Sequence, residues 1–152
     1  MRLNLRGPLG HGFDLPITAH RVALIAFDDS PYRLLALFDS IPKQDSSVVL
    51  ICANLPEDLP LEIEVQPMSA LADICSWADY IAVDAGRGSL PGLKKKFGFG
   101  RPLKIPDVAQ ILVRTPMPCG ALAECGICTV EIGSGRQLAC ADGPVFDLKE
   151  LL

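Results

Sequence analysis

Four of the six cysteines of this chain fall in one short stretch near its C-terminal end. Cys119, Cys125, Cys128 and Cys140 follow the spacing C-x5-C-x2-C-x11-C. Three thiolates on one loop and a fourth on a later strand are typical of plant-type [2Fe–2S] sites, which have the spacing C-x4-C-x2-C…C. Such a cluster needs two thiolates per iron and a loop whose backbone N–H groups can approach its sulfides, so the loop needs small residues. This loop has them at Gly120, Ala121, Ala123 and Gly126.

Structural zinc is the main alternative for the same four cysteines. Zinc sites usually have two close pairs of ligands, and here only Cys125 and Cys128 form such a pair. Neither His11 nor His20 lies near them in the sequence. The N-terminal residues contain no secretory signal, so we expect a cytoplasmic protein with reduced thiols, which makes disulfides a minor alternative. The spacing favours the cluster and leaves zinc open.

The composition narrows the class of protein. The 152 residues are 49% hydrophobic and 21% charged, which fits a domain with a packed core and at most a small appendage. The net charge of −4 gives no electrostatic reason to expect nucleic acid or an anionic membrane as a partner. No apolar stretch approaches the ~18 residues that a membrane span needs. Cys52 and Cys75 lie among apolar residues, and we interpret both as inert core thiols.

Upstream of the cysteines, short apolar runs alternate with segments that have helical spacing. This alternation predicts a small parallel α/β sheet flanked by helices over roughly residues 18–108. We expect strands at 21–28, 46–54, 61–67, 80–86 and 110–116, and helices at 29–41, 69–80 and 90–98. Ser30 or Asp29 is expected to cap the first helix, and Ser69 the second.

The sequence changes character after residues 115–118, which form a proline-bounded linker. Residues 128–132 and 137–140 are predicted to pair as a hairpin that carries the last cysteine back to the loop. This tail is too short to build a hydrophobic core of its own, and segments of that size usually depend on a metal or disulfides. We therefore expect an α/β domain over residues 1–114 and a cluster-binding domain over residues 115–152.

The cysteine segment resembles the C-terminal [2Fe–2S] domain of dihydroorotate dehydrogenase electron transfer subunits, a ferredoxin-reductase-like family. That family has a Met-x-Cys-Gly loop, a Cys-x2-Cys pair and a final Cys followed by x-x-Gly-Pro-Val-Phe. The matching residues here are Met117, Cys119, Gly120, Cys125, Cys128, Cys140 and residues 143–146. The first loop has five residues where the family commonly has four. "GPLGHGF" at residues 7–13 also resembles the segment that leads into the family's pyridine-nucleotide domain.

The resemblance implies a non-catalytic component of an oxidoreductase complex in pyrimidine biosynthesis. Its [2Fe–2S] cluster would relay electrons between the FMN of a dihydroorotate dehydrogenase-like flavoprotein and an FAD. Relatives begin with an FAD-binding β-barrel, for which the residues before Gly7 leave no room, so FAD is expected on a partner chain. No residue of this chain is expected to act as a catalytic acid, base or nucleophile.

The segment that corresponds to the family's nucleotide site departs from the pattern. Relatives have a glycine-rich turn after the first strand, and this chain has Phe27, Asp28 and Asp29. Where relatives have Cys-Gly-Pro, it has residues 85–87, Ala-Gly-Arg. Because bulk and negative charge oppose a pyrophosphate, these changes favour the loss of NAD binding. Two other functions stay open: an interaction module whose metal only folds the tail, and a reductase that retains NAD(P)H.

Overall fold

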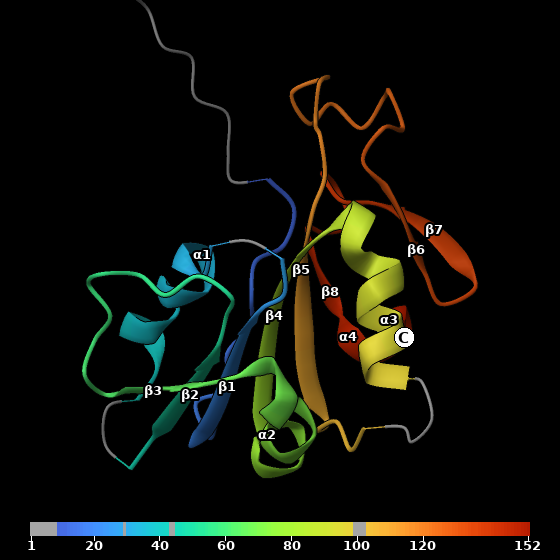
Figure 1. The fold of residues 1–152 in the computed structure, drawn as a ribbon. Coiled ribbons are helices and arrows are strands. Elements are labelled where there is room, and N and C mark those ends of the chain that lie inside the picture. Colours follow the sequence, from blue (N-terminus) through green and yellow to red (C-terminus); the bar gives the residue numbers. More distant parts are fainter. Residues whose placement is uncertain (1–8, 29, 43–44, 99–102) are drawn as a thin grey trace, which may run out of the picture.

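Six strands form one sheet in the order β3-β2-β1-β4-β5-β8 (Figure 1). The computed structural model describes residues 9–28, 30–42, 45–98 and 103–152. The first five strands are parallel, and β8 pairs with β5 in the antiparallel sense. The strands are β1 (Arg21–Ala26), β2 (Ser47–Ile51), β3 (Ile63–Gln66), β4 (Tyr80–Gly86), β5 (Val108–Arg114) and β8 (Val145–Asp147). The predicted α/β class is confirmed.

The central strands are buried on both faces, as their unbroken apolar runs predict. Alternate residues of β1 enter two separate cores: Val22 and Leu24 on one face, Ala23 and Ile25 on the other. The first core lies under α1 (Tyr32–Leu35), and the second under α2 (Leu71–Trp77), α3 (Leu90–Gly98) and α4 (Leu148–Leu151). Helices therefore cover both faces of the sheet.

Two of the predicted helices differ in detail from the structure. The helix expected at 29–41 forms only α1, followed by a 3-10 turn, η1 (Phe38–Ser40). The prediction that Ser30 caps the first helix is wrong: the N-cap residue of α1 is Pro31 and no side chain caps it, although the Tyr32 N–H donates to Ser30 Oγ at 3.4 Å. Asp29 lies outside the described residues. The prediction that Ser69 caps the second helix is wrong, because that residue lies inside the 3-10 turn η2 (Met68–Ala70), and no side chain caps α2.

The C-terminal segment contains the predicted hairpin, formed by β6 (Thr129–Ile132) and β7 (Gly135–Leu138). Val130, Ile132 and Phe146 are buried in the same core as Leu93 and Phe97 of α3. The tail therefore shares the core of the α/β sheet, and it is not held by a metal or disulfides alone, as its length had suggested. Since β8 also completes the large sheet, the domain boundary at residue 114 stays a prediction.

Two further features of the helices concern the burial of their side chains. Cys75 is 1% exposed and belongs to the core under α2, and Lys94–Lys96 form an exposed face of α3. In the part of the chain that the structure describes, no helix has the length and apolar character to cross a membrane.

Candidate metal centre

The loop between β5 and β6 carries three of the four clustered cysteines. It projects beyond the sheet at the end where the parallel strands finish, drawn in orange at the top of Figure 1. Met117 and Ala121 pack against the core under α3, and they anchor the base of this loop. Cys140 lies two residues after β7, so the hairpin returns it to the loop as predicted.

The four thiols meet as two pairs. A hydrogen bond joins Cys119 to Cys125, and another joins Cys128 to Cys140. The negative charge of Cys119 also affects Cys140, so the two pairs are close enough to interact. Cys125 is exposed, whereas Cys128 and Cys140 are 2% and 5% exposed. One pair therefore lies toward solvent and the other toward the core.

The loop backbone turns its N–H groups toward the sulfurs. Hydrogen bonds from the Cys125 thiol and then from the Leu122 backbone N–H lower the pKa of Cys119 to about 7. The hydrogen bond with Cys128, together with burial, raises the pKa of Cys140, whose sulfur also accepts from the Ala123 N–H. Backbone N–H groups gathered around sulfur anions form a site suited to a negatively charged cluster. The residues of this loop therefore fit an iron–sulfur cluster.

Left-handed backbone conformations make this arrangement possible. The φ angles are +62° at Gly120, +63° at Ala121, +61° at Ala123 and +66° at Gly126. Residues with side chains rarely adopt this region, and bulky ones least of all. The small residues noted in the sequence thus stand where the chain winds around the thiols.

The pairing bears on the choice between zinc and a two-iron cluster. Among residues 9–28, 30–42, 45–98 and 103–152, no three His, Cys, Asp or Glu side chains are placed to hold one metal ion. A structural zinc takes four ligands around one centre, whereas a [2Fe–2S] cluster takes two thiolates on each iron. The two pairs of thiols correspond to the two thiolates that each iron of a [2Fe–2S] cluster takes.

The N-terminal segment around His11 lies beside residues 143–145, which follow the last cysteine of the site. His11 and Pro144 form an isolated β-bridge, in which the His11 N–H donates to the Gly143 carbonyl and the Val145 N–H donates to the His11 carbonyl at 3.3 Å. A Cβ at Gly10 would lie 1.6 Å from the Gly143 oxygen, and one at Gly143 would lie 2.3 Å from the Phe146 ring. The close approach of the two segments thus requires glycine at position 10, and the packing of the Phe146 ring on its own segment requires glycine at position 143. Gly7 and Pro8 lie outside the described residues.

A carboxylate lies at the edge of the sheet where folds of this kind bind nucleotides. Parallel sheets bind ligands at the carboxyl ends of neighbouring strands whose connections run in opposite directions, here β1 and β4. Asp28 lies there, accepts a hydrogen bond from the Gly86 N–H at 3.0 Å, and forms an ion pair with Arg114. Arg114 also pairs at 2.6 Å with Asp84, which is 1% exposed and pairs with Arg33 at 3.4 Å. At this edge of the sheet, the Asp28 carboxylate therefore already accepts a backbone N–H.

We accordingly expect that NADH does not bind at the carboxyl ends of β1 and β4. Because the Asp28 carboxylate already accepts the Gly86 N–H, a pyrophosphate would have to displace it and would meet its negative charge. Fluorescence titration of NADH into the purified chain should show no saturation up to about 1 mM, the range of the weakest specific binding. Saturable binding in the micromolar range would contradict this expectation.

Thiol reactivity provides a test of the site in protein without a bound metal. An alkylating reagent is expected to modify Cys119 well before Cys75, because the thiolate is the reactive form. With a pKa of about 7, Cys119 should react faster as the pH rises through about 7 and level off about one unit higher. Burial raises the pKa of Cys75 to about 11, so it should stay protonated and unmodified at pH values near 9. Timed labelling with mass spectrometry measures both rates, and equal rates in the folded protein would contradict the expectation.

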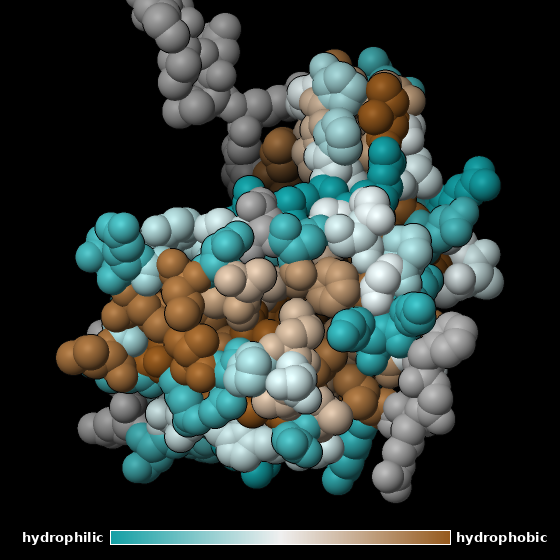
Figure 2. All heavy atoms as spheres, in the orientation of Figure 1, coloured by the Kyte–Doolittle hydropathy of each residue, from teal (hydrophilic) through white to brown (hydrophobic). Residues whose placement is uncertain are grey.

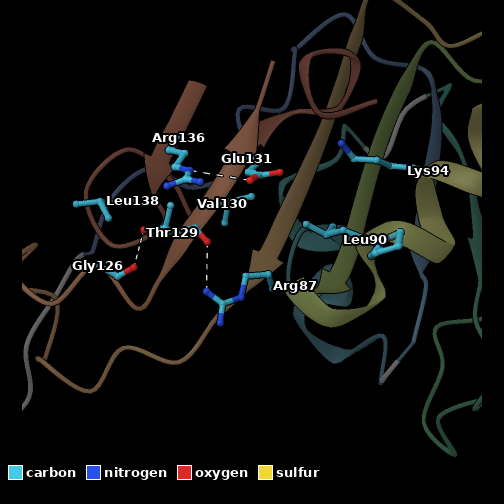
Figure 3. A pocket seen from close by; sticks show the side chains of 10 residues that line it. Arg87, Leu90, Lys94, Gly126, Thr129, Val130, Glu131, Arg136 and Leu138 are labelled. Atoms are coloured by element: carbon cyan, nitrogen blue, oxygen red, sulfur yellow. Dashed lines mark hydrogen bonds and ion pairs between the residues drawn. The ribbon is translucent and has the colours of Figure 1, made fainter. Parts of the chain in front are cut away.

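An open cleft of about 740 Å³ lies between α3 and the β6–β7 hairpin (Figure 3). Its lining residues include three basic side chains, Arg87, Lys94 and Arg136. Arg87 reaches across to the cluster loop and donates to two of its backbone carbonyls, those of Ile127 and Thr129. The sequence marked Arg87 only as a departure from a family motif, since side chain to backbone contacts leave no pattern in a sequence.

Comparison with known proteins bears on the cysteine segment and on the fold. Residues 115–152 match the model of the iron–sulfur cluster binding domain of dihydroorotate dehydrogenase B. All four clustered cysteines lie in the matched segment, so the chain has a C-terminal iron–sulfur domain of this type. Among curated proteins, no match to the sequence was found.

The fold is similar to that of a chain from a structure described as an NADH-dependent reduced ferredoxin–NADP oxidoreductase, in work on flavin-based electron bifurcation. The TM-score is 0.69 with 15% sequence identity, over 97% of this chain and 59% of that one. This chain therefore spans less than two thirds of the length of that relative. At such low identity the likeness concerns the fold alone.

Proposed function

We propose that this chain is an electron-transfer subunit that relays electrons through a [2Fe–2S] cluster between flavins of partner proteins. Cys119 and Cys125 would hold one iron, and Cys128 and Cys140 the other. The observation that carries the proposal is the meeting of four thiols as two pairs, inside the segment that matches an iron–sulfur domain. When bound, the cluster supplies a one-electron redox centre.

The residues of the chain position this centre between solvent and core. Backbone N–H groups of Leu122 and Ala123 point at the sulfurs of Cys119 and Cys140, where they would stabilise added negative charge. The exposed Cys125 places one side of the site at the surface, which is where an electron can pass to another protein. The task needs no acid, base or nucleophile, so none of the described residues is assigned such a role.

The projecting loop also has a surface suited to a protein partner. Leu122 and Ile127 are 49% and 47% exposed on either side of Cys125, and Figure 2 shows hydrophobic atoms on this loop among polar ones. Exposed apolar side chains next to a redox centre favour close docking and the exclusion of water. The partners proposed by family resemblance are a dihydroorotate dehydrogenase-like flavoprotein with FMN and a separate chain with FAD.

The contacts of Asp28 support the placement of the nucleotide chemistry elsewhere. With Asp28 on the Gly86 N–H, the proposed route of electrons does not pass through NAD on this chain. A purely structural metal is less well supported, since the tail shares the core of the sheet. The chain would thus hold one cluster in place within a larger complex and set its reduction potential.

Anaerobic isolation of the native complex tests the relay. We expect a flavoprotein to copurify, and the substrate of that flavoprotein to bleach the visible absorption of the cluster within the turnover time of the complex. The isolated chain with the same substrate serves as the control and should stay oxidised. A cluster that the flavoprotein's substrate cannot reduce in the complex would contradict the proposed relay.

A further inference from the structure

Arg87 connects the large sheet to the backbone around Cys128. It is the first residue of η3 (Arg87–Ser89), the 3-10 turn that directly follows β4. Its Nη1 donates to the Ile127 carbonyl and to the Thr129 carbonyl, the latter at 3.2 Å, as Figure 3 shows for Thr129. These carbonyls belong to the residues on either side of Cys128. One guanidinium therefore holds the backbone carbonyls of both sequence neighbours of a buried ligand of the proposed cluster.

A second contact fixes the same turn from within the loop. The Thr129 N–H and Oγ both donate to the Gly126 carbonyl, at 3.2 and 2.5 Å. Residues 126–129 are thus closed by Thr129 and tied to the sheet by Arg87. A site held by rigid elements keeps its ligands and its charges at fixed positions, which a free surface loop would not.

The charge of Arg87 is permanent, because a guanidinium stays protonated in proteins. Its hydrogen bonds to the carbonyls of the residues before and after Cys128 place it within about 10 Å of that sulfur, since consecutive Cα atoms are about 3.8 Å apart. Reduction adds one negative charge to a cluster, so a nearby fixed cation stabilises the reduced form. We infer that Arg87 is a positioning residue that holds the backbone at Cys128 and raises the reduction potential of the cluster. This inference rests on the proposed function.

The other charges of the cleft are more solvated. Arg136 and Glu131 lie 4.0 Å apart with their side chains 77% and 79% exposed, and Lys94 is also exposed. Solvent and salt screen such charges over distances near 8–10 Å. Lys94 lines the same cleft and carries the same charge as Arg87, and so it provides a matched control for a general effect of surface charge.

Redox titrations of the full chain, reconstituted with iron and sulfide and followed by EPR, test the inference. The variants are Arg87→Gln, Arg87→Lys and Lys94→Gln. At a fixed potential, Arg87→Gln should lower the ratio of reduced to oxidised cluster about tenfold, which is about 59 mV for a one-electron couple. Arg87→Lys keeps the charge and should stay within about threefold of the wild type, as should Lys94→Gln.

Three results would overturn the inference. A loaded Arg87→Gln variant with the wild-type potential would show that the charge has no effect, and an equal fall in Lys94→Gln would show that any nearby cation acts alike. An Arg87→Gln variant that takes up no iron, beside a wild type that does, would assign Arg87 a structural role only. A wild-type chain that binds no cluster would instead overturn the proposed function, and the inference with it.

Discussion

The Cys140→Ala variant is expected to lose its cluster. Cys140 is one of two buried thiolates in the site, and without it the second iron would keep Cys128 as its only protein ligand. A two-iron cluster needs two thiolates on each iron, so we expect iron to fall from about two per chain to below about a tenth of that value. The visible absorption and the EPR signal of the reduced protein should disappear with it.

Cys75→Ala is the matched control for this experiment. Cys75 is as buried as Cys140, at 1% against 5% exposed, but it belongs to α2, at the opposite end of the sheet from the cysteine loop (Figure 1). The control loses a similar sulfur atom from the core and should keep its iron. Full iron content in Cys140→Ala, or an equal loss in Cys75→Ala, would contradict the assignment of the ligands.

Gly10→Ala is expected to lower the stability more than alanine at any other glycine that the structure describes. The new Cβ would lie 1.6 Å from the Gly143 oxygen, and the backbone at Gly10 has a φ of +60°. Neither backbone can yield without breaking the bridge between His11 and Pro144. Overpacking and a strained φ together should lower the free energy of unfolding by about 3 kcal/mol.

Gly12→Ala provides the comparison within the same motif. No atom lies within 4 Å of a Cβ at Gly12, and its φ is not in the left-handed region. The substitution should change the free energy of unfolding by less than about 1 kcal/mol, with a stabilising sign if the unfolded chain loses entropy. Denaturant unfolding of both variants measures the difference, and equal stabilities would contradict the packing of the two motifs.

The sequence predicted the features that depend on local pattern. The apolar run at 80–86 is β4 with the bounds expected, and the small residues of the cysteine loop adopt the left-handed conformations that small residues permit. The spacing of the cysteines singled out the four thiols that the structure brings together as pairs. Each of these features depends on residues that are close together in the sequence.

Features that depend on distant contacts were missed. β8 has three residues, too few to show a period, and only its pairing with β5 makes it a strand. The length of the tail predicts no core, because the sequence does not reveal that Phe146 packs with residues of α3. Arg87 likewise acquires its role from carbonyls 40 and 42 residues away. Tertiary packing decides such features, and one sequence alone does not record it.

Metal analysis of the wild-type chain, purified without oxygen, tests the central claim most directly. We predict about two irons, about two sulfides and no zinc per chain, with visible absorption that bleaches on addition of dithionite. The reduced protein should then give the rhombic EPR signal of a single unpaired electron on a two-iron cluster. One zinc per chain, with no colour and no EPR signal after reduction, would contradict the claim that this protein carries electrons.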